Sequence, residues 1–391
     1  MAAALEQGLE ARIIGTQAAS DMAAAWRDLF KGCADANPFY GPHFLLPLLA
    51  LGGKLARTRF VVVSSGPELV ALCPIMPRGF AFPGLASAVG TLSHAFIFNA
   101  LPLLREGYER RGWRAILDAL EARQGRGVLD IDTSPLDGVA ATSLMEALAE
   151  SGRASLVIGR SERAGIVATG SADAHLARIK ARTMTKLRRQ ERLLAELGEI
   201  GFRTAMSGQA LAEAVDGFLA LEARGWKGRQ GSAFASDPRT ASFAREALAS
   251  GGDAPGVRIE LLTLDGRPVG ACLHLVAPAY SATFKIAHDE ELSRQAPGVL
   301  AMLGSLKALL AEPWTQRLDS GAGPEDAVGA VWRDRIPTGR ILAALSPRQG
   351  ERELRLYAKA GALVEDVRTR AREAYYALTG RKRTRARKAR G

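Results

Sequence analysis

The stretch that decides the fold covers residues 279–310 and reads AYSATFKIAHDEELSRQAPGVLAMLGSLKALL. Residues 279–287 carry the β-branched and aromatic side chains typical of a strand. Residues 297–310 predict a helix, because Val299, Leu303, Leu306 and Leu310 recur at helical spacing. A strand that runs through a short loop straight into a helix is an arrangement that can hold a ligand.

The start of this helix has the features of an anion site. The first turn of a helix leaves backbone N–H groups unpaired and carries a partial positive charge, so it can bind a phosphate. Pro297 suits the first helical position, because its missing donor would have had no helical partner. Gly298 has no Cβ to keep a pyrophosphate from the backbone, and Arg294 adds a cation just outside. An ordinary capped loop would show the same Pro-Gly pair, so the motif alone is weak.

The elements around this stretch occur twice. In the second half, strands at 257–264 and 268–276 flank Asp265-Gly266, a hairpin-turn dipeptide, and a short strand at 317–320 follows the helix. In the first half, strands at 59–64 and 68–75 form a hairpin, and a helix at 108–123 and a strand at 127–132 follow. An offset of 199 residues superposes the two hairpins and aligns Arg59 with Arg258, Val70 with Val269 and Cys73 with Cys272. This predicts two tandem lobes.

The fold class predicted from this order is α/β, with mixed sheets in two related lobes. The expected domains are an N-terminal lobe at 1–165, a basic connecting helix at 166–200, a C-terminal lobe at 201–350, an amphipathic helix at 351–380 and a basic disordered tail at 381–391. In the connecting segment, residues 172–197 predict one long helix. Its basic side chains either face solvent or form a cationic wall over a phosphate-bearing ligand.

Composition excludes several classes of protein. The 391 residues are 47% apolar and 24% charged, a balance typical of a soluble globular protein, and we expect it in the cytoplasm. Three scattered cysteines and five histidines predict neither a disulfide framework nor a metal site. Seven basic residues in the tail RKRTRARKARG account for most of the net charge of +11, so the body needs no polyanion partner.

The helix at 351–378 carries a stripe of small and apolar residues at helical spacing: Ala360, Leu363, Val364, Val367, Ala371, Ala374 and Leu378. Such a stripe usually packs on the parent domain. An amphipathic face next to a polybasic tail is also the combination that favours weak contact with a membrane surface.

The order hairpin, strand, phosphate loop, helix and strand resembles the acetyltransferase fold known as GNAT. The pyrophosphate loop of that family reads Gln/Arg-x-x-Gly-x-Gly/Ala, and Gln295 and Gly298 match it, whereas Leu300 departs from it. The chain is similar to the CelD/FemAB-like branch over roughly residues 176–345. That similarity rests on Phe218 to Glu222, Gly225-Trp226-Lys227-Gly228, Phe284 to Asp289, Ala296-Pro297-Gly298 and Leu318 to Gly321.

The resemblance implies transfer of an acyl group from acetyl-coenzyme A or another acyl-coenzyme A to an amine. In this family the strand before the phosphate loop splays from its neighbour, and its N–H groups receive the cofactor and polarise the thioester. Carried onto this sequence, the implied cofactor contacts come from Lys285, Ile286, Ala287, Arg294, Gln295, Pro297 and Gly298.

Candidates for removing the proton of the amine follow the same strand. His288 and Asp289 end it, and Asp319 lies at the start of the next, where the two strands are expected to diverge. Asp319 is the first choice and His288 its rival, although either residue could equally be a loop residue. Glu222, Trp226 and Lys227 are the expected acceptor contacts, because an indole offers a flat face and a lysine can meet a carboxylate or phosphate.

Three functions remain open at this point. The first is an acyl-coenzyme A-dependent N-acyltransferase for a small amine such as an amino sugar or amino acid, linked to exopolysaccharide or cell-envelope synthesis by its resemblance. The second is a FemAB-like transferase whose donor is an aminoacyl transfer RNA. The third is a non-catalytic scaffold of the same fold at the membrane surface.

Overall fold

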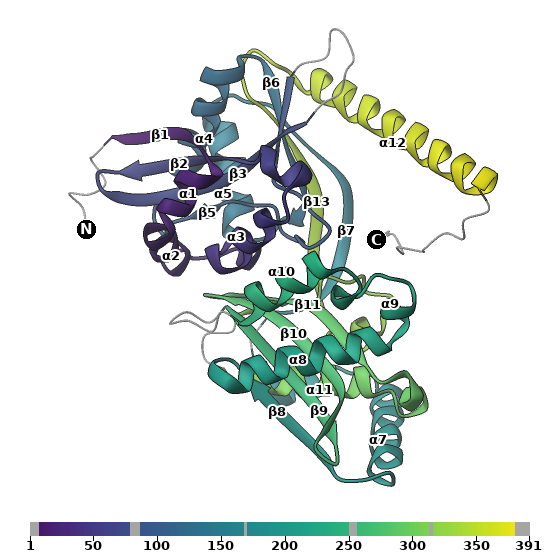
Figure 1. Ribbon diagram of the computed structural model, residues 1–391. Coiled ribbons are helices and arrows are strands. Elements are labelled where there is room, and N and C mark those ends of the chain that lie inside the picture. The colour runs from purple at the N-terminus through teal and green to yellow at the C-terminus, as the bar shows by residue number, and fades with distance from the viewer. Residues whose placement is uncertain (1–7, 79–86, 168–169, 250–255, 313–315, 380–391) are drawn as a thin grey trace. The chain divides into compact units, whose positions relative to one another are not determined.

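The computed structural model describes residues 8–78, 87–167, 170–249, 256–312 and 316–379. The basic tail, predicted to be disordered, lies outside these residues. Two compact units are present. Of the described residues, those within 8–34, 56–161 and 338–379 form the first unit, and those within 35–55 and 162–337 form the second. Both mix strands and helices, as the sequence predicts (Figure 1). The predicted domain boundaries stay predictions.

The first unit is built on a mixed sheet with the strand order β1-β2-β3-β4-β6-β13. Neighbouring strands are antiparallel except β4 and β6, which are parallel. The helices α4 and α5 contribute Trp113, Ile116 and Leu144 to a core with sheet residues. The strands are β1 (Leu9–Gly15), β2 (Arg59–Ser65), β3 (Glu68–Arg78), β4 (Ser87–Thr91), β5 (Leu103–Leu104), β6 (Gly127–Pro135) and β13 (Asp334–Ala344). The helices are α1 (Thr16–Asp21), α2 (Ala23–Lys31), α4 (Glu109–Gln124), α5 (Val139–Glu150) and α12 (Glu351–Thr379).

The second unit repeats this plan with the strand order β7-β12-β11-β10-β9-β8. Only β11 and β12 are parallel. The strands are β7 (Ser155–Val167), β8 (Ile200–Ala205), β9 (Val257–Leu264), β10 (Arg267–Ala277), β11 (Tyr280–His288) and β12 (Arg317–Asp319). The α-helices are α3 (Pro42–Ala50), α6 (Ala172–Ala177), α7 (Ala181–Ala195), α8 (Gly208–Arg224), α9 (Trp226–Arg229), α10 (Pro238–Ala249) and α11 (Pro297–Leu310). The short 3-10 helices are η2 (Pro38–Tyr40), η3 (Gly53–Arg57), η4 (Phe234–Ser236), η5 (Glu290–Gln295) and η6 (Ala327–Ala330).

The two hairpins have the same register, residue for residue, at the offset of 199. Val61 pairs with Cys73 in the first unit, and Glu260 pairs with Cys272 in the second. Each hairpin also has a bulge at the equivalent place, where Val70 and Val269 are the extra residues. Because a bulge is a defined structural feature rather than noise, its repetition supports two lobes of common plan.

The last strand of each half of the sequence pairs with a strand from the other half. From the second half, β13 pairs with β6, and from the first half the end of β7 pairs with β12. The sequence did not predict β7, because Arg160, Glu162 and Arg163 interrupt any alternation of apolar and polar side chains.

Two helix predictions need correction. Residues 172–197 form two helices, α6 and α7, because Lys180 adopts an extended conformation (φ −55°, ψ 134°) and the turn buries Ile179 in the core. In α12, Leu363 and Val367 are each 57% exposed, so this part of the apolar stripe is not core.

None of the helices within the described ranges combines the length and the apolar character that crossing a bilayer requires. Figure 1 shows α12 as a long helix running out from the first unit.

The packing of α11 onto its sheet depends on Gly270. A Cβ at this position would lie 2.7 Å from the Pro297 carbonyl oxygen and 3.1 Å from Ala301 Cβ. We therefore predict that Gly270→Ala lowers the free energy of unfolding by about 1–3 kcal/mol, measured by chemical denaturation. The control is Gly15→Ala, whose new Cβ has no atom within 4 Å. Equal stability of the two variants would show that α11 adjusts without cost.

Candidate active site

The loop before α11 is shaped by local hydrogen bonds. Asp289 caps η5, because its Oδ1 accepts the Glu291 N–H at 3.1 Å, and its Oδ2 pairs with Arg267 at 3.0 Å. Ala296 then adopts a left-handed conformation with φ 48° and ψ 50°, and Pro297 opens α11 as predicted. A non-glycine residue in this region carries backbone strain, which is often kept at functional sites.

The strand β11 has an open edge beside this loop. Its pairing with β10 continues to His288, but its pairing with β12 covers only Tyr280, Ser281 and Ala282. Ile286 accepts a hydrogen bond from Lys227 Nζ at 2.9 Å through its carbonyl oxygen, which shows that this carbonyl faces away from β10. In a strand the N–H and C=O of one residue point to the same side, so the Ile286 N–H faces the open edge as well.

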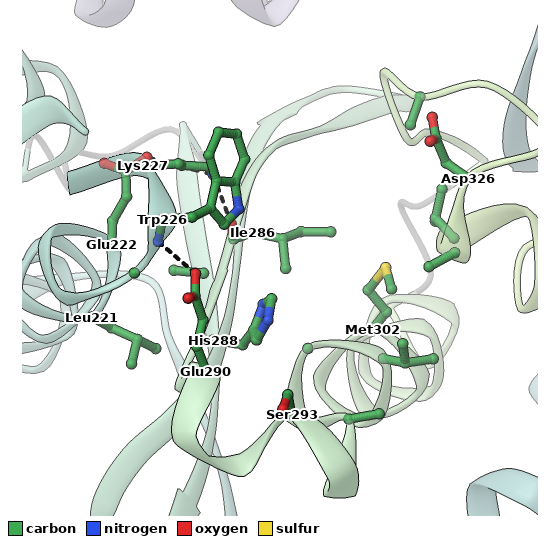
Figure 2. Close-up of a pocket in the computed structure, with 18 residues that line it drawn as sticks. Leu221, Glu222, Trp226, Lys227, Ile286, His288, Glu290, Ser293, Met302 and Asp326 are labelled. Carbon is green, nitrogen blue, oxygen red and sulfur yellow. Dashed lines mark hydrogen bonds and ion pairs between the residues drawn. The ribbon is translucent and has the colours of Figure 1, made fainter. Parts of the chain in front are cut away.

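The open edge and the start of α11 border one cavity of about 490 Å³ (Figure 2). Its walls come from α8, α9, the end of β11, η5, α11 and the segment 322–328, and all of them lie in the second unit. The lining is mainly apolar, with a few polar groups. The residues are Leu221, Glu222, Gly225, Trp226, Lys227, Ile286, Ala287, His288, Glu290, Ser293, Ala296, Gly298, Val299, Met302, Ala322, Asp326, Ala327 and Val328.

Two glycines let the Gly225-Trp226-Lys227-Gly228 motif turn tightly off the end of α8. A Cβ on Gly228 would lie 1.7 Å from the Ala223 carbonyl oxygen, and one on Gly225 would lie 3.2 Å from Glu290 Oε1. The Glu290 carboxylate accepts the Trp226 N–H and pairs with Arg229, and the hydrogen bond from Arg229 lowers the pKa of Glu290. Glu290 therefore fixes α9 to the loop before α11, as the dashed line to Trp226 in Figure 2 shows.

A buried carboxylate joins α8 to β11. Glu222 is 2% exposed, and its Oε1 accepts from Lys285 Nζ at 2.7 Å and lies 3.6 Å from Lys227 Nζ. Its Oε2 accepts the Phe234 N–H at 2.9 Å, and Lys285 Nζ lies 3.8 Å from the centre of the Phe234 ring. Burial lowers the pKa of Lys227, and the nearby Lys285 cation adds to this effect, whereas Glu222 opposes it.

The structure brings seven of the thirteen sequence-predicted site residues to the cavity wall. These are Glu222, Trp226, Lys227, Ile286, Ala287, His288 and Gly298. The other six are not among the lining residues: Lys285, Asp289, Arg294, Gln295, Pro297 and Asp319. Their predicted roles, like those of the first seven, stay predictions.

Asp319 is buried and is held by protein groups. Its Oδ2 accepts from Tyr280 Oη at 3.0 Å and from Arg163 Nη1 at 3.1 Å, and its Oδ1 accepts the Gly321 N–H at 2.8 Å. Burial, followed by the Asp319 charge, raises the pKa of Tyr280. These contacts fasten the end of β12 to β11 and β7 at the place where β11 and β12 part.

Sequence reasoning missed Glu290, Ser293, Val299, Met302 and the segment 322–328 as lining residues. Met302 lies one helical turn after Gly298, so the spacing of α11 would have indicated it. The segment 322–328 gave no signal, because its place depends on where β12 ends. The described residues hold no group of three or more His, Cys, Asp or Glu side chains placed to bind a metal.

One cavity of the second unit is thus bordered by an open strand edge and by the first turn of a helix. Residues 181–327 match the family model of the acetyltransferase (GNAT) domain, and this part of the chain is a GNAT acetyltransferase domain. The protein is therefore an acyltransferase of the GNAT type. No curated protein matches the chain.

Several solved structures have a similar fold at low sequence identity. A conserved protein of unknown function from Bacteroides thetaiotaomicron matches with a TM-score of 0.52 and 12% identity, over 84% of this chain and 97% of that chain. The C-terminal domain of a putative lysylphosphatidylglycerol synthetase from Agrobacterium fabrum matches with a TM-score of 0.51 and 13% identity, over 86% and 95%. FemX matches with a TM-score of 0.52 and 12% identity, over 82% and 95%. At these identities the similarity concerns the fold.

The contacts of Asp319 lead to a prediction that separates a structural from a catalytic role. Asp319→Asn weakens charge-assisted hydrogen bonds to Tyr280 and Arg163, so we expect unfolding to become easier by about 1.5–3 kcal/mol. The measurement is thermal or chemical denaturation, with Asp326→Asn, at an exposed position seven residues further along the chain, as control. Unchanged stability of Asp319→Asn, together with lost turnover, would instead support Asp319 as the group near the amine.

Proposed function

We propose that the protein transfers an acyl group from acetyl-coenzyme A or another acyl-coenzyme A to the amine of a small molecule, such as an amino sugar or an amino acid. The observation that carries the proposal is that one cavity is bordered by both the open edge of β11 and the first turn of α11. A donor with a diphosphate and an extended amide-bearing arm has the chemistry that these two features bind.

Several residues would hold the donor. The N–H groups at the start of α11, around Gly298, would receive the diphosphate, and a Cβ on Gly298 would lie 3.1 Å from His288 Nδ1, so the glycine keeps this corner open. The Ile286 N–H would meet the arm of the donor along the open edge. The bound coenzyme supplies an activated acyl group, and the protein supplies alignment, a dry pocket and oriented N–H donors.

The amine must lose a proton to attack, and His288 is the candidate base on the cavity wall. Trp226, 42% exposed, would offer its indole face to the acceptor. The resemblance to the CelD/FemAB-like branch extends the proposal to a role in exopolysaccharide or cell-envelope synthesis. Cys33, Cys73 and Cys272 are all buried, and the reducing cytoplasm, which we propose as the location, keeps such side chains as thiols.

A second candidate function has an aminoacyl transfer RNA as donor. It is favoured by the exposed basic side chains of α7 and the residue before it, a set formed by Lys180, Arg182, Lys186, Arg188, Arg189 and Arg192. α7 packs against η5 and α11, which border the cavity. A basic surface beside the site could bind the phosphates of a nucleic acid.

A weak contact with an anionic membrane surface is a further part of the proposal. In α12, Leu356, Leu363 and Val367 are 57–59% exposed, and the sequence that follows the helix holds seven basic residues and no acidic one. An apolar row beside a basic segment combines the two attractions that such binding needs. The protein should co-sediment with vesicles containing phosphatidylglycerol, and truncation after residue 380 should abolish this; binding to purely zwitterionic vesicles would contradict the electrostatic part.

A substitution of Gly298 tests the proposal that an acyl-coenzyme A binds with its diphosphate at the start of α11. A valine there would crowd both His288 and the diphosphate, so Gly298→Val should lower the affinity for acetyl-coenzyme A at least about tenfold, a loss of about 1.4 kcal/mol, in isothermal titration calorimetry. Gly350→Val, at a position with no atom within 4 Å of the new Cβ, is the control. Melting curves verify that both variants are folded. Unchanged affinity of a folded Gly298→Val would rule out the diphosphate site.

The salt dependence of binding distinguishes the two donors. If transfer RNA is the donor, its binding should weaken steeply as salt is raised, and Arg188→Glu with Arg189→Glu should reduce it much more than they reduce binding of acetyl-coenzyme A. Filter binding at several salt concentrations measures this. Tight binding of acetyl-coenzyme A without measurable binding of transfer RNA would rule out the transfer RNA donor and support the acyl-coenzyme A donor.

A further inference from the structure

The side chain of Lys227 reaches from α9 to the open edge of β11. Its Nζ lies 2.9 Å from the Ile286 carbonyl oxygen, and the side chain is 22% exposed (Figure 2). The same edge presents the Ile286 N–H, which the proposed function assigns to the arm of the donor. An ammonium group therefore lies at the edge where the reacting end of an acyl-coenzyme A would be held.

Glu222 keeps this ammonium in place. The carboxylate is shared by Lys285 at 2.7 Å and Lys227 at 3.6 Å, and its second oxygen is bound to the Phe234 N–H at 2.9 Å. Two cations on one carboxylate leave one positive charge in excess. Because Lys285 lies closer to Glu222 and stacks on Phe234, Lys227 is the more weakly held of the two and the one that lines the cavity.

We propose that Lys227 is the catalytic acid that protonates the departing thiol of the acyl-coenzyme A, and that Glu222 is the positioning residue that holds the Lys227 ammonium at the open edge of β11. This inference rests on the proposed function and assigns Lys227 a part in the reaction rather than in binding an anionic group of the acceptor.

The step balances within the site. The amine nitrogen forms a bond to the thioester carbonyl carbon, the carbon–sulfur bond breaks, and its electron pair leaves with the sulfur. The Lys227 ammonium gives its proton to the sulfur. The nitrogen of the new amide carries one proton too many and returns it to the neutral Lys227 amine. The products are an amide and a free thiol, and Lys227 ends as it began.

The surroundings of Lys227 suit this role. The charged or titratable groups that contact Lys227 or line the cavity with it are Glu222 on α8, Lys285 and His288 on β11, Glu290 on η5 and Asp326 before η6. Glu222 and Glu290 are engaged by backbone N–H groups and by cations. Burial and Lys285 lower the pKa of Lys227, which brings it nearer to that of a thiol, about 8.5. A smaller difference makes the proton transfer easier.

The experiment uses free coenzyme A as the probe, so that it needs no acceptor. The thiolate absorbs in the ultraviolet, and a pH titration of the complex reports the pKa of the bound thiol. A nearby cation favours the thiolate, so the pKa of the bound thiol should be lower in the wild type than in Lys227→Met by about 1 pKa unit or more. Lys307→Met, which removes an exposed lysine near the far end of α11, should match the wild type.

Two further variants separate catalysis from structure. Lys227→Arg keeps the charge but cannot give up a proton near neutral pH, so it should retain the low pKa of the bound thiol and lose acyl transfer. Glu222→Gln should move the pKa of the bound thiol part of the way toward that of Lys227→Met. Melting curves identify any variant that fails to fold, and Lys227→Arg then carries the test in place of Lys227→Met.

The outcomes are distinct. Calorimetry first establishes that the wild type binds coenzyme A, and its failure to bind would overturn the proposed function and this inference together. If the wild type and Lys227→Met both bind coenzyme A and their bound thiols titrate alike, the role of Lys227 is wrong while the donor site stands. A thiol that titrates lower in the wild type, with transfer lost in Lys227→Arg, is the result we expect.

Discussion

The site depends on the point at which β11 loses one of its two neighbours. β11 and β12 pair only through Ala282, whereas β10 accompanies β11 to His288. Backbone N–H and C=O groups beyond that point still require partners, because an unpaired polar group in the interior costs about 1–3 kcal/mol. Lys227 satisfies the Ile286 carbonyl, and the cavity gives the Ile286 N–H access to a ligand. An open strand edge of this kind leaves backbone groups with which a ligand can form hydrogen bonds.

The same parting explains why buried charges surround the site. Asp319 fastens β12 to β11 just before they diverge, through Tyr280 and Arg163. Glu222 fastens α8 to β11 just after they diverge, through Lys285. Each carboxylate is buried and bound by cations or backbone N–H groups, since removal of one member of a buried pair would leave an uncompensated charge. These contacts fix β12 and α8 to β11 on either side of the point where the two strands part.

The two units share a strand order and a hairpin register but differ at the start of the helix that packs on the sheet. At the positions equivalent to Gly270, the first unit has Ala71, and its helix α4 meets that residue with Gly112. The first turn of α4 carries Glu109, whose charge disfavours a phosphate there, whereas the first turn of α11 carries no acidic residue. A shared hairpin register therefore does not imply a shared ligand, because the chemistry of the helix start differs.

The sequence by itself determined the elements whose causes are local. The hairpin at Asp265-Gly266 forms because both residues adopt positive φ, and α11 begins at Pro297 because proline suits a first turn. Tertiary structure alone decided the break at Lys180, the exchange of β7 and β13, and the placing of Lys227 against Ile286 with Glu290 clamping α9. Those features join residues far apart in the chain. These features depend on where each strand ends and on which side chains become buried. No short stretch of sequence determines either of these.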